Sequence, residues 1–406
     1  MTRSRDAAIG LLKTLRNAGF ESYFAGGCVR DALLGLTPKD YDIATGATPD
    51  QVARLLPHCR MVGKAFGVVL SQPAKGVSVE IATFRTDGTY TDGRRPDAVV
   101  FTDAKGDAQR RDFTINGLFA DPLAPHPDGS DRVIDFVGGQ EDLKKGVIRA
   151  IGNPEERFGE DFLRLLRAVR FASRLNFSIE ERTWQALQAN APKLNGIARE
   201  RIGDEVRRMM SGPRFAAAAQ LLEKGGLAGL VLGLPASGAF TPMRLARLTP
   251  EAAYPARLMA WLHDRGDRSA EENLVRVRTG LNLTNGERDS LAALPPLLAR
   301  AAGWDDLGMA ARKRLLAEKE WPEAQRLLEA CQDTAGLANA VARDARLLAE
   351  DGIGISPTPF LTGGVLMALG LAPGPRFKHL LDAGYDLQLE GKLSSKTEAQ
   401  AWAAQN

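Results

Sequence analysis

The sequence predicts an α+β protein, in which a small β-sheet with helices is followed by helices alone. Two observations predict this fold. Over residues 1 to about 146, short β-like runs alternate with helical runs, and glycine, proline and aspartate stand between them. After the turn-rich segment 121–139, apolar residues recur at three- and four-residue spacing, and strand-like stretches are nearly absent.

The individual elements follow from the same two patterns. In the N-terminal part, short β-like runs predict strands over 22–25, 40–44, 68–71, 77–85 and 99–102. A helix is expected over 29–36, directly after a two-glycine turn. In the C-terminal part, apolar periodicity predicts helices over 158–175, 182–191, 199–210 and 214–224. Breaks are expected near Gly212-Pro213, at Pro295-Pro296 and over 356–359.

Composition is typical of a folded chain with two to four domains. The 406 residues are 44% hydrophobic and 25% charged, which excludes disordered and fibrous classes. Three cysteines, Cys28, Cys59 and Cys331, are odd in number and form no CxxC pair. They argue against a disulfide framework and for a reducing compartment, so a cytoplasmic protein is expected. The longest weakly charged stretch, 225–240, is too short and too rich in glycine for a membrane span.

Positive charge is concentrated in one segment, although the net charge is only +3. Residues 143–214 hold 15 Lys and Arg against 9 Asp and Glu, an excess of +6. Such a segment suits phosphate or nucleic acid as a partner. Solvated helix faces with ion pairs are the alternative interpretation. No feature of the sequence indicates an obligatory protein partner.

A glycine turn followed by two aspartates is the first candidate site. Gly26-Gly27 follows a strand and precedes a helix, so the backbone there can approach a phosphate closely. On a strand, Asp40 and Asp42 project to the same side, and two acids so close repel each other unless a cation binds between them. A Mg²⁺ site is therefore expected, with an ordinary polar strand face as the alternative. Glu80, turned outward on the strand 77–85, is a candidate third acid or an ordinary exposed glutamate.

Two further segments supply arginines. Arg110 to Asn116 combines a basic pair with an acid and an amide, which suits a triphosphate and a ribose or a helix N-terminal network. Residues 160–170 predict a helix on which Arg164, Arg167 and Arg170 share one side and apolar residues the other. Together with the glycine turn and the acid pair, this pattern indicates metal-dependent nucleotidyl transfer.

Five motifs give the chain a specific resemblance. The segments GGCVRDALLGLTPKDYDIAT, RRDFTIN, DFVGG, EDFLRLLRAVRFASRL and ARERIGDEV resemble, in order and spacing, the motifs of class II tRNA nucleotidyltransferases, the CCA-adding enzymes and their bacterial poly(A) polymerase relatives. The match covers roughly residues 20–215. The resemblance implies a catalytic head at 1–146, a base-selecting neck at 147–213, and an RNA-binding body at 214–298 and tail at 299–406.

The resemblance also implies a role for each matching residue. Asp40 and Asp42 would hold Mg²⁺, and Gly27 and Arg30 would contact the nucleotide phosphates. Arg111 with Asp112 would grip the triphosphate or ribose. Asp161 and Arg164 would read the base, and Arg167 and Arg170 would support them or touch phosphate. Three residues would brace the base-reading helix: Arg199, Glu200 and Arg201. The segment 85–97 resembles the flexible loop of members that add ATP.

Base selection follows from hydrogen-bond chemistry. Asp161 only accepts and Arg164 only donates. Cytosine and adenine each offer an amino donor beside a ring acceptor, whereas uracil and guanine offer the reverse pattern. This chemistry selects CTP and ATP, and the resemblance implies that they are used for CCA addition to tRNA 3′ ends. The alternatives are an A-adding enzyme, a poly(A) polymerase, a non-catalytic RNA-binding protein, or a small-molecule nucleotidyltransferase, which would not need the arginine helix. An ion pair between Asp161 and Arg164 at the helix start is the structural alternative for these two residues.

Overall fold

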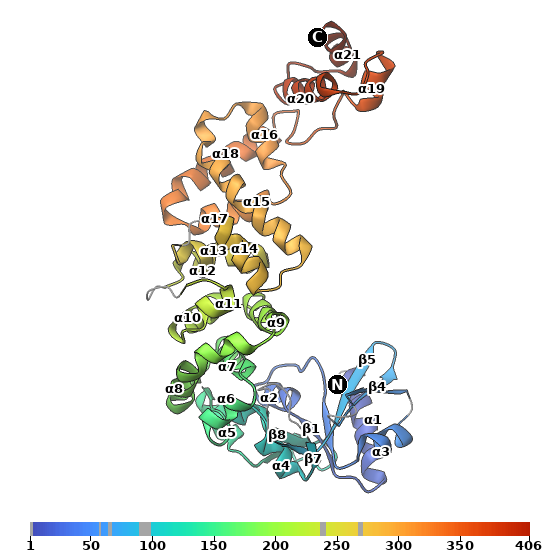
Figure 1. Cartoon of the computed structure of the whole chain (residues 1–406). Coiled ribbons are helices and arrows are strands. Elements are labelled where there is room, and N and C mark those ends of the chain that lie inside the picture. The colour runs from blue at the N-terminus through green and yellow to red at the C-terminus, as the bar shows by residue number, and fades with distance from the viewer. Residues whose placement is uncertain (1–2, 57, 64–66, 89–98, 236–240, 267–270) are drawn as a thin grey trace. The chain divides into compact units, whose positions relative to one another are not determined.

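A computed structural model of the chain describes residues 3–56, 58–63, 67–88, 99–235, 241–266 and 271–406. The chain forms two compact units, residues 1–239 and 240–406. The first unit contains every described strand, and the second contains helices only (Figure 1). The expected α+β class is confirmed. The division into head, neck, body and tail stays a prediction.

One seven-stranded mixed sheet forms the base of the first unit. Its strand order is β3-β4-β5-β2-β1-β8-β9, and only β2 and β5 pair in parallel. The strands are β1 (Ser22–Ala25), β2 (Ile43–Thr45), β3 (Cys59–Gly63), β4 (Val68–Ala74), β5 (Val77–Thr83), β8 (Leu118–Asp121) and β9 (Arg132–Asp135). Two small sheets pair β6 (Arg85–Asp87) with β7 (Val99–Phe101), and β10 (Val147–Ile148) with β11 (Ser178–Ile179).

Helices of the first unit lie against this sheet and continue beyond it. They are α1 (Arg3–Asn17), α2 (Gly27–Leu33), α3 (Pro49–Leu55), α4 (Ala104–Gln109), α5 (Gly139–Lys145), α6 (Pro154–Glu160), α7 (Leu163–Leu175), α8 (Glu181–Asn190), α9 (Arg199–Met210), α10 (Phe215–Lys224) and α11 (Ala228–Leu232). Phe24, Ile43, Ile81 and Phe119 are almost fully buried. Their burial fixes which way the neighbouring polar residues on each strand face.

The second unit is built from helices α12 to α21. They are α12 (Met243–Arg247), α13 (Tyr254–Asp264), α14 (Glu271–Gly280), α15 (Asn285–Ala302), α16 (Met309–Leu316), α17 (Trp321–Ala330), α18 (Ala335–Ala349), α19 (Gly363–Ala368), α20 (Pro375–Leu389) and α21 (Lys396–Gln405). Trp261 and Trp304 are fully buried in it. Among the described residues, no helix combines the length and apolar character that a membrane crossing requires.

Several predicted elements are wrong in detail. The strand expected over 40–44 starts only at Ile43, although the carbonyl of Asp42 still accepts the Ala25 N–H at 3.0 Å. Pro295 and Pro296 lie inside α15 instead of ending it, because Leu291, Leu294 and Leu297 are buried on both sides of them. Strands β3, β6, β8, β9, β10 and β11 were not expected, and the helix expected over 29–36 spans Gly27–Leu33. Of the segment 85–97, residues 89–97 lie outside the described residues.

The helix expected over 158–175 is interrupted at Asp161. Its backbone is extended there, with φ −151° and ψ 107°, so α6 ends at Glu160 and α7 starts at Leu163. The Asp161 side chain accepts the backbone N–H of Leu163 at 3.0 Å, which satisfies a donor at the start of α7. The interruption turns the Asp161 side chain away from a helix surface and toward α9.

Candidate functional site

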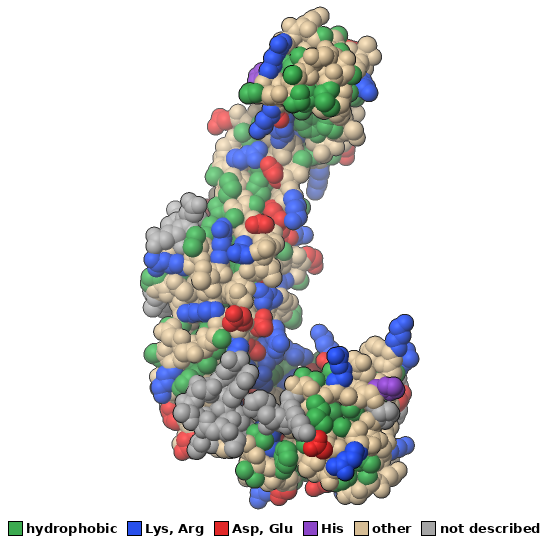
Figure 2. Space-filling view, turned by 45° about the vertical axis from the view of Figure 1, so that its right-hand side comes forward, with side chains coloured by type: hydrophobic (Ala, Val, Ile, Leu, Met, Phe, Trp, Pro, Cys, Tyr) green, Lys and Arg blue, Asp and Glu red, His purple; other side chains and the backbone are tan. Residues whose placement is uncertain are grey.

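A cavity of about 650 Å³ opens in the first unit and gathers the predicted site residues. Every predicted site residue except Glu80 lines it. The lining comes from the turn after β1, the segment before β2, the loop after α4, and the facing sides of α7 and α9: Gly26, Gly27, Arg30, Asp40, Asp42, Arg110, Arg111, Asp112, Asn116, Asp161, Leu163, Arg164, Arg167, Arg170, Phe171, Arg174, Arg201 and Arg208. On the face that Figure 2 shows, by contrast, basic and acidic side chains are interspersed. The cavity therefore concentrates arginines in a way that this surface does not.

Two carboxylates form the acidic end of the cavity. Tyr41 and Ile43 are buried, so Asp40 and Asp42 face away from the core, as predicted. Ile43 pairs with Ile81 across β2 and β5, which makes Glu80 the neighbour of Asp42 on the next strand. Loss of hydration, then the charges of Glu80 and Asp40, raise the pKa of Asp42 to about 6, while Arg111 lowers it.

The acid pair has the chemistry that a hard divalent cation requires. Oxygen ligands from carboxylates suit Mg²⁺, and a cation beside Asp42 would relieve the repulsion that raises its pKa. The residues present therefore fit such an ion. Within the described part of the chain, no group of three His, Cys, Asp or Glu side chains converges on one metal position. The assignment of Glu80 as a third acid stays a prediction.

At the glycine turn, backbone atoms and the side chains of Arg30 and Arg111 line the same wall of the cavity. Gly26 has φ 71°, and a Cβ at this position would lie 2.9 Å from Nη1 of Arg111. Arg30, on α2, is buried and donates from Nη1 to Asn116 Oδ1 at 2.6 Å and from Nη2 to Asp31 Oδ1 at 2.6 Å. Glycine at 26 is favoured because φ 71° with ψ −121° is a backbone conformation that residues with a Cβ rarely adopt, and an added Cβ would also press against the Arg111 guanidinium.

The loop after α4 carries the next polar network. Arg111 donates from Nη2 to Asp107 at 2.9 Å and from Nη1 to the carbonyl of Asn116 at 3.2 Å. Asp112 is buried, and its Oδ2 accepts Nε of Arg167 at 2.7 Å. Its Oδ1 accepts Nδ2 of Asn116 at 3.0 Å. Burial alone would raise the pKa of Asp112, but Arg167 and Asn116 hold it well below its usual range. Asp112 is thus an anionic anchor for α7.

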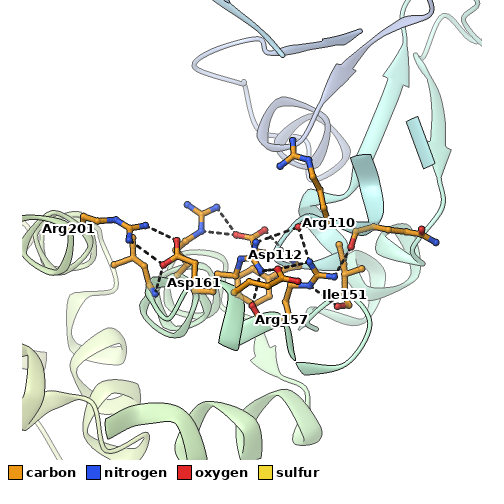
Figure 3. Close-up of polar contacts among 12 residues, drawn as sticks. Arg110, Asp112, Ile151, Arg157, Asp161 and Arg201 are labelled. Atoms are coloured by element: carbon orange, nitrogen blue, oxygen red, sulfur yellow. Dashed lines mark hydrogen bonds and ion pairs between the residues drawn. The ribbon is translucent and has the colours of Figure 1, made fainter. Parts of the chain in front are cut away.

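The predicted base-reading pair lies where α6 gives way to α7. Asp161 Oδ2 accepts Nη2 of Arg201 at 2.6 Å, and Oδ1 accepts Nη1 at 3.3 Å (Figure 3). Arg164 instead forms an ion pair with Glu160 and donates to the carbonyl of Arg157 at 2.7 Å. The alternative expectation, an ion pair between Asp161 and Arg164, is wrong because each has a closer partner. Both side chains line the cavity, one as an acceptor and one as a donor.

The arginine face of α7 is as predicted, and three arginines pack around the ring of Phe171 beside it. Arg167 and Arg170 lie 5.4 Å and 4.3 Å from the Phe171 ring, and Arg30 approaches the same ring at 5.1 Å. Arg170 donates to Glu205 of α9 at 2.6 Å. Arg201 braces the start of α7 through its bonds to Asp161, as predicted. Arg199 instead donates to the carbonyl of Leu230, and the Glu200 side chain is exposed.

Sequence reasoning missed several residues of the cavity and its support. Arg174 and Arg208 line it, and Asp107 and Glu205 hold its arginines. Helical spacing carried a signal for two of them. Arg174 lies four residues after Arg170, and Arg208 lies seven after Arg201, so each continues a face already noted. Buried acids such as Asp107 carry no such signal.

Two family models match the chain. One, described as the poly A polymerase head domain, matches residues 22–149. The other, described as a probable RNA and SrmB-binding site of polymerase A, matches residues 176–235. The mixed sheet with its acid pair, and the head model that matches it, define the chain as a nucleotidyltransferase.

Comparison with known proteins makes the family specific. The chain is 38% identical to a CCA-adding enzyme of Geobacillus thermodenitrificans over 76% of each chain, and 45% identical to one of Ligilactobacillus salivarius over 50% of this chain and 49% of that relative. The crystal structure of the Bacillus stearothermophilus CCA-adding enzyme in complex with CTP has a TM-score of 0.79 at 30% identity, covering 100% of this chain and 98% of that one. The chain therefore belongs to the family of class II CCA-adding enzymes and poly(A) polymerases.

Proposed function

We propose that this chain completes the 3′ end of tRNA by adding CCA from CTP and ATP. One observation carries the proposal: an acceptor, Asp161, and a donor, Arg164, line the same cavity. This cavity also holds the acid pair and the arginine cluster. The relatives named above are CCA-adding enzymes, and one of them was crystallised with CTP. tRNA as substrate implies action in the cytoplasm.

The chemistry divides between the two ends of the cavity. The tRNA 3′ hydroxyl attacks the α-phosphate of the nucleotide, a new phosphodiester bond forms, and pyrophosphate leaves. Asp40 and Asp42 would hold Mg²⁺, which when bound lowers the pKa of the attacking hydroxyl and neutralises charge on the phosphates. Arg30 and Arg111, beside the Gly26-Gly27 turn, bind the triphosphate oxygens as donors.

Base selection depends on donors and acceptors that the protein fixes in advance. Arg201 and the Leu163 N–H take three of the roughly four acceptor positions of the Asp161 carboxylate. One position on Oδ2 remains for the exocyclic amino group of cytosine or adenine. The bonds to Glu160 and Arg157 use Nη1 of Arg164, so Nε is left to donate to the ring nitrogen of the base. Uracil and guanine would place a carbonyl toward Asp161 and an N–H toward Arg164.

Incubation with defined tRNA transcripts tests the proposal. Transcripts that end at the discriminator base, at C or at CC are incubated with CTP, ATP or both, and the products are sequenced at their 3′ ends. Addition of CCA to the first transcript is the expected result. A single A on the CC-ending transcript alone would assign an A-adding enzyme, and long A tails would assign a poly(A) polymerase. Absence of addition to every transcript would contradict catalysis.

A further inference from the structure

Asp107 lies behind the cavity wall and holds two of its arginines. Its residue surface is 1% exposed, and it does not line the cavity. Oδ1 accepts Nε of Arg110 at 2.8 Å, and Oδ2 accepts Nη2 and Nε of Arg111 at 2.9 Å and 3.2 Å. Oδ1 also accepts the backbone N–H of Arg85 at 3.3 Å. One buried carboxylate thus fixes two guanidinium groups and the first residue of β6.

The charge of Asp107 is stabilised by these arginines. Burial alone would raise the pKa of Asp107, but Arg111 and Arg110 lower it by more, so the pKa is below its ordinary value. The carboxylate is therefore ionised at neutral pH. Loss of this charge removes the buried partner that the two guanidinium groups share, so their positions at the cavity become less restrained.

Each arginine transmits the position of Asp107 to a different part of the cavity. Arg111 continues across the glycine turn to the carbonyl of Asn116, and its guanidinium lies 5.1 Å from the Phe119 ring. The carbonyl of Arg110 accepts Nη1 of Arg157 at 3.0 Å and Nη2 of Arg164 at 3.5 Å. The phosphate side and the base side of the cavity therefore share one anchor.

We propose that Asp107 is a positioning residue for the nucleotide. It directs Arg110 and Arg111 toward the polyphosphate chain of a nucleoside triphosphate and, through the carbonyl of Arg110, supports Arg164 at the base. The inference rests on the proposed function of the cavity, which it deepens by assigning the polyphosphate chain to Arg110 and Arg111. The carboxylate itself touches no substrate.

Asp107→Asn is the variant that tests this role, with Asp103→Asn as its matched control. Asp103 caps the same helix, α4, and accepts the Gly106 N–H at 2.8 Å without lining the cavity. Asp107→Asn is expected to raise KM for CTP and ATP, and the dissociation constant of inorganic tripolyphosphate, by about tenfold or more, because a charge-assisted anchor is lost. KM for tRNA stays unchanged. Asp103→Asn keeps a good helix N-cap and is expected to leave all of these constants unchanged.

A second variant and a second measurement keep the outcomes distinct. Asp107→Glu keeps the charge and is expected to recover most of the lost tripolyphosphate binding. Equal constants for Asp107→Asn and Asp103→Asn, or a fall in kcat with KM and tripolyphosphate binding unchanged, would overturn the positioning role. If Asp107→Asn does not fold, Asp107→Glu is compared with the wild type instead, and loss of tripolyphosphate binding by this folded, charge-retaining variant would overturn the anchoring role. Calorimetry with tripolyphosphate needs no turnover, so it tests Asp107 even if the wild-type chain adds nothing to RNA.

Discussion

The two ends of the cavity use charge in opposite ways. At the arginine end, acids are paired: Asp112 with Arg167, Asp107 with Arg110 and Arg111, Glu205 with Arg170, Glu160 with Arg164, and Asp161 with Arg201. At the acidic end, Asp40 and Asp42 have no ion-pair partner among the described residues, and the pKa of Asp42 is raised to about 6.

The charges at the arginine end are paired within the chain, whereas those at the acidic end need a bound cation. The arginine end is preorganised, because its donors are already oriented by buried carboxylates. The acidic end remains electrostatically unfavourable until a cation binds. Substitutions at the two ends should therefore differ in kind: those at the acidic end stop the reaction, and those at the arginine end change which nucleotide is used and how tightly.

The largest effect is expected for Asp42→Asn. Loss of a carboxylate at the acidic end should reduce nucleotide incorporation by about a thousandfold or more, since metal assistance supplies several kcal/mol to the reaction. RNA binding, measured by filter retention, should be kept. Asp289→Asn, at an exposed position of α15, is the control. Turnover by Asp42→Asn within tenfold of the control would remove Asp42 from the metal site.

The double variant Asp161→Ala with Arg164→Ala tests the arginine end. Without the acceptor and donor pair, the preference for CTP and ATP over UTP and GTP should fall by about a hundredfold, because hydrogen-bonding groups that reject the wrong base are gone. Single-nucleotide incorporation kinetics with each of the four triphosphates measure it. The matched control is Asp204→Ala with Arg207→Ala, a pair at the same spacing on α9 that does not line the cavity. Unchanged selectivity would refute base reading by Asp161 and Arg164.

Gly26→Ala is expected to have a smaller effect on catalysis, through Arg111. Its control is Gly19→Ala, because Gly19 also has a positive φ, 86°, but no atom lies within 4 Å of an added Cβ. Both variants should lose about 1 kcal/mol or more of stability from the backbone strain. KM for CTP and ATP should rise about tenfold in Gly26→Ala alone, because its Cβ displaces a triphosphate-binding guanidinium. Equal KM values for CTP and ATP in the two variants would contradict the claim that a Cβ at residue 26 weakens triphosphate binding through Arg111.

The smallest predicted effect concerns stability and pH. The pKa of Asp42 is raised from 3.8 to about 6 in the folded chain, so ionisation of Asp42 costs stability as pH rises through this interval. In metal-free buffer, Asp42→Asn should therefore raise stability by about 1 kcal/mol near pH 7, a value discounted for the exposure of the side chain. Below the unfolded-state pKa the gain should vanish. Melting curves with a chelator measure it, and a gain that is equal at both pH values would contradict the shift.

Local patterns predicted much of the fold, whereas the resemblance of the five motifs implied the roles of most of the cavity-lining residues. The short β-like run 22–25 identified β1, alternation identified β5, and three- and four-residue spacing identified α9 and the arginine face of α7. Strand β8 escaped because all four of its residues are buried, so it shows no alternation. Strand β9 escaped because it is short and lies in a turn-rich segment.

The pairing of charges is what the sequence could not provide. Asp161 bonds Arg201, 40 residues away, and Asp112 bonds Arg167, 55 residues away. With 53 basic and 50 acidic residues, the sequence allows many such pairs and selects none. At the helix break, Asp161 combines a local contact with a distant one: it accepts the Leu163 N–H and also bonds Arg201 on α9.

Competition among all four nucleoside triphosphates tests the central claim most directly. A tRNA transcript that ends at its discriminator base is incubated with Mg²⁺ and equal concentrations of ATP, CTP, GTP and UTP, and the 3′ ends are sequenced. The account predicts that products end in CCA and that U and G are rare. Incorporation of U or G as often as C and A would contradict selection by Asp161 and Arg164.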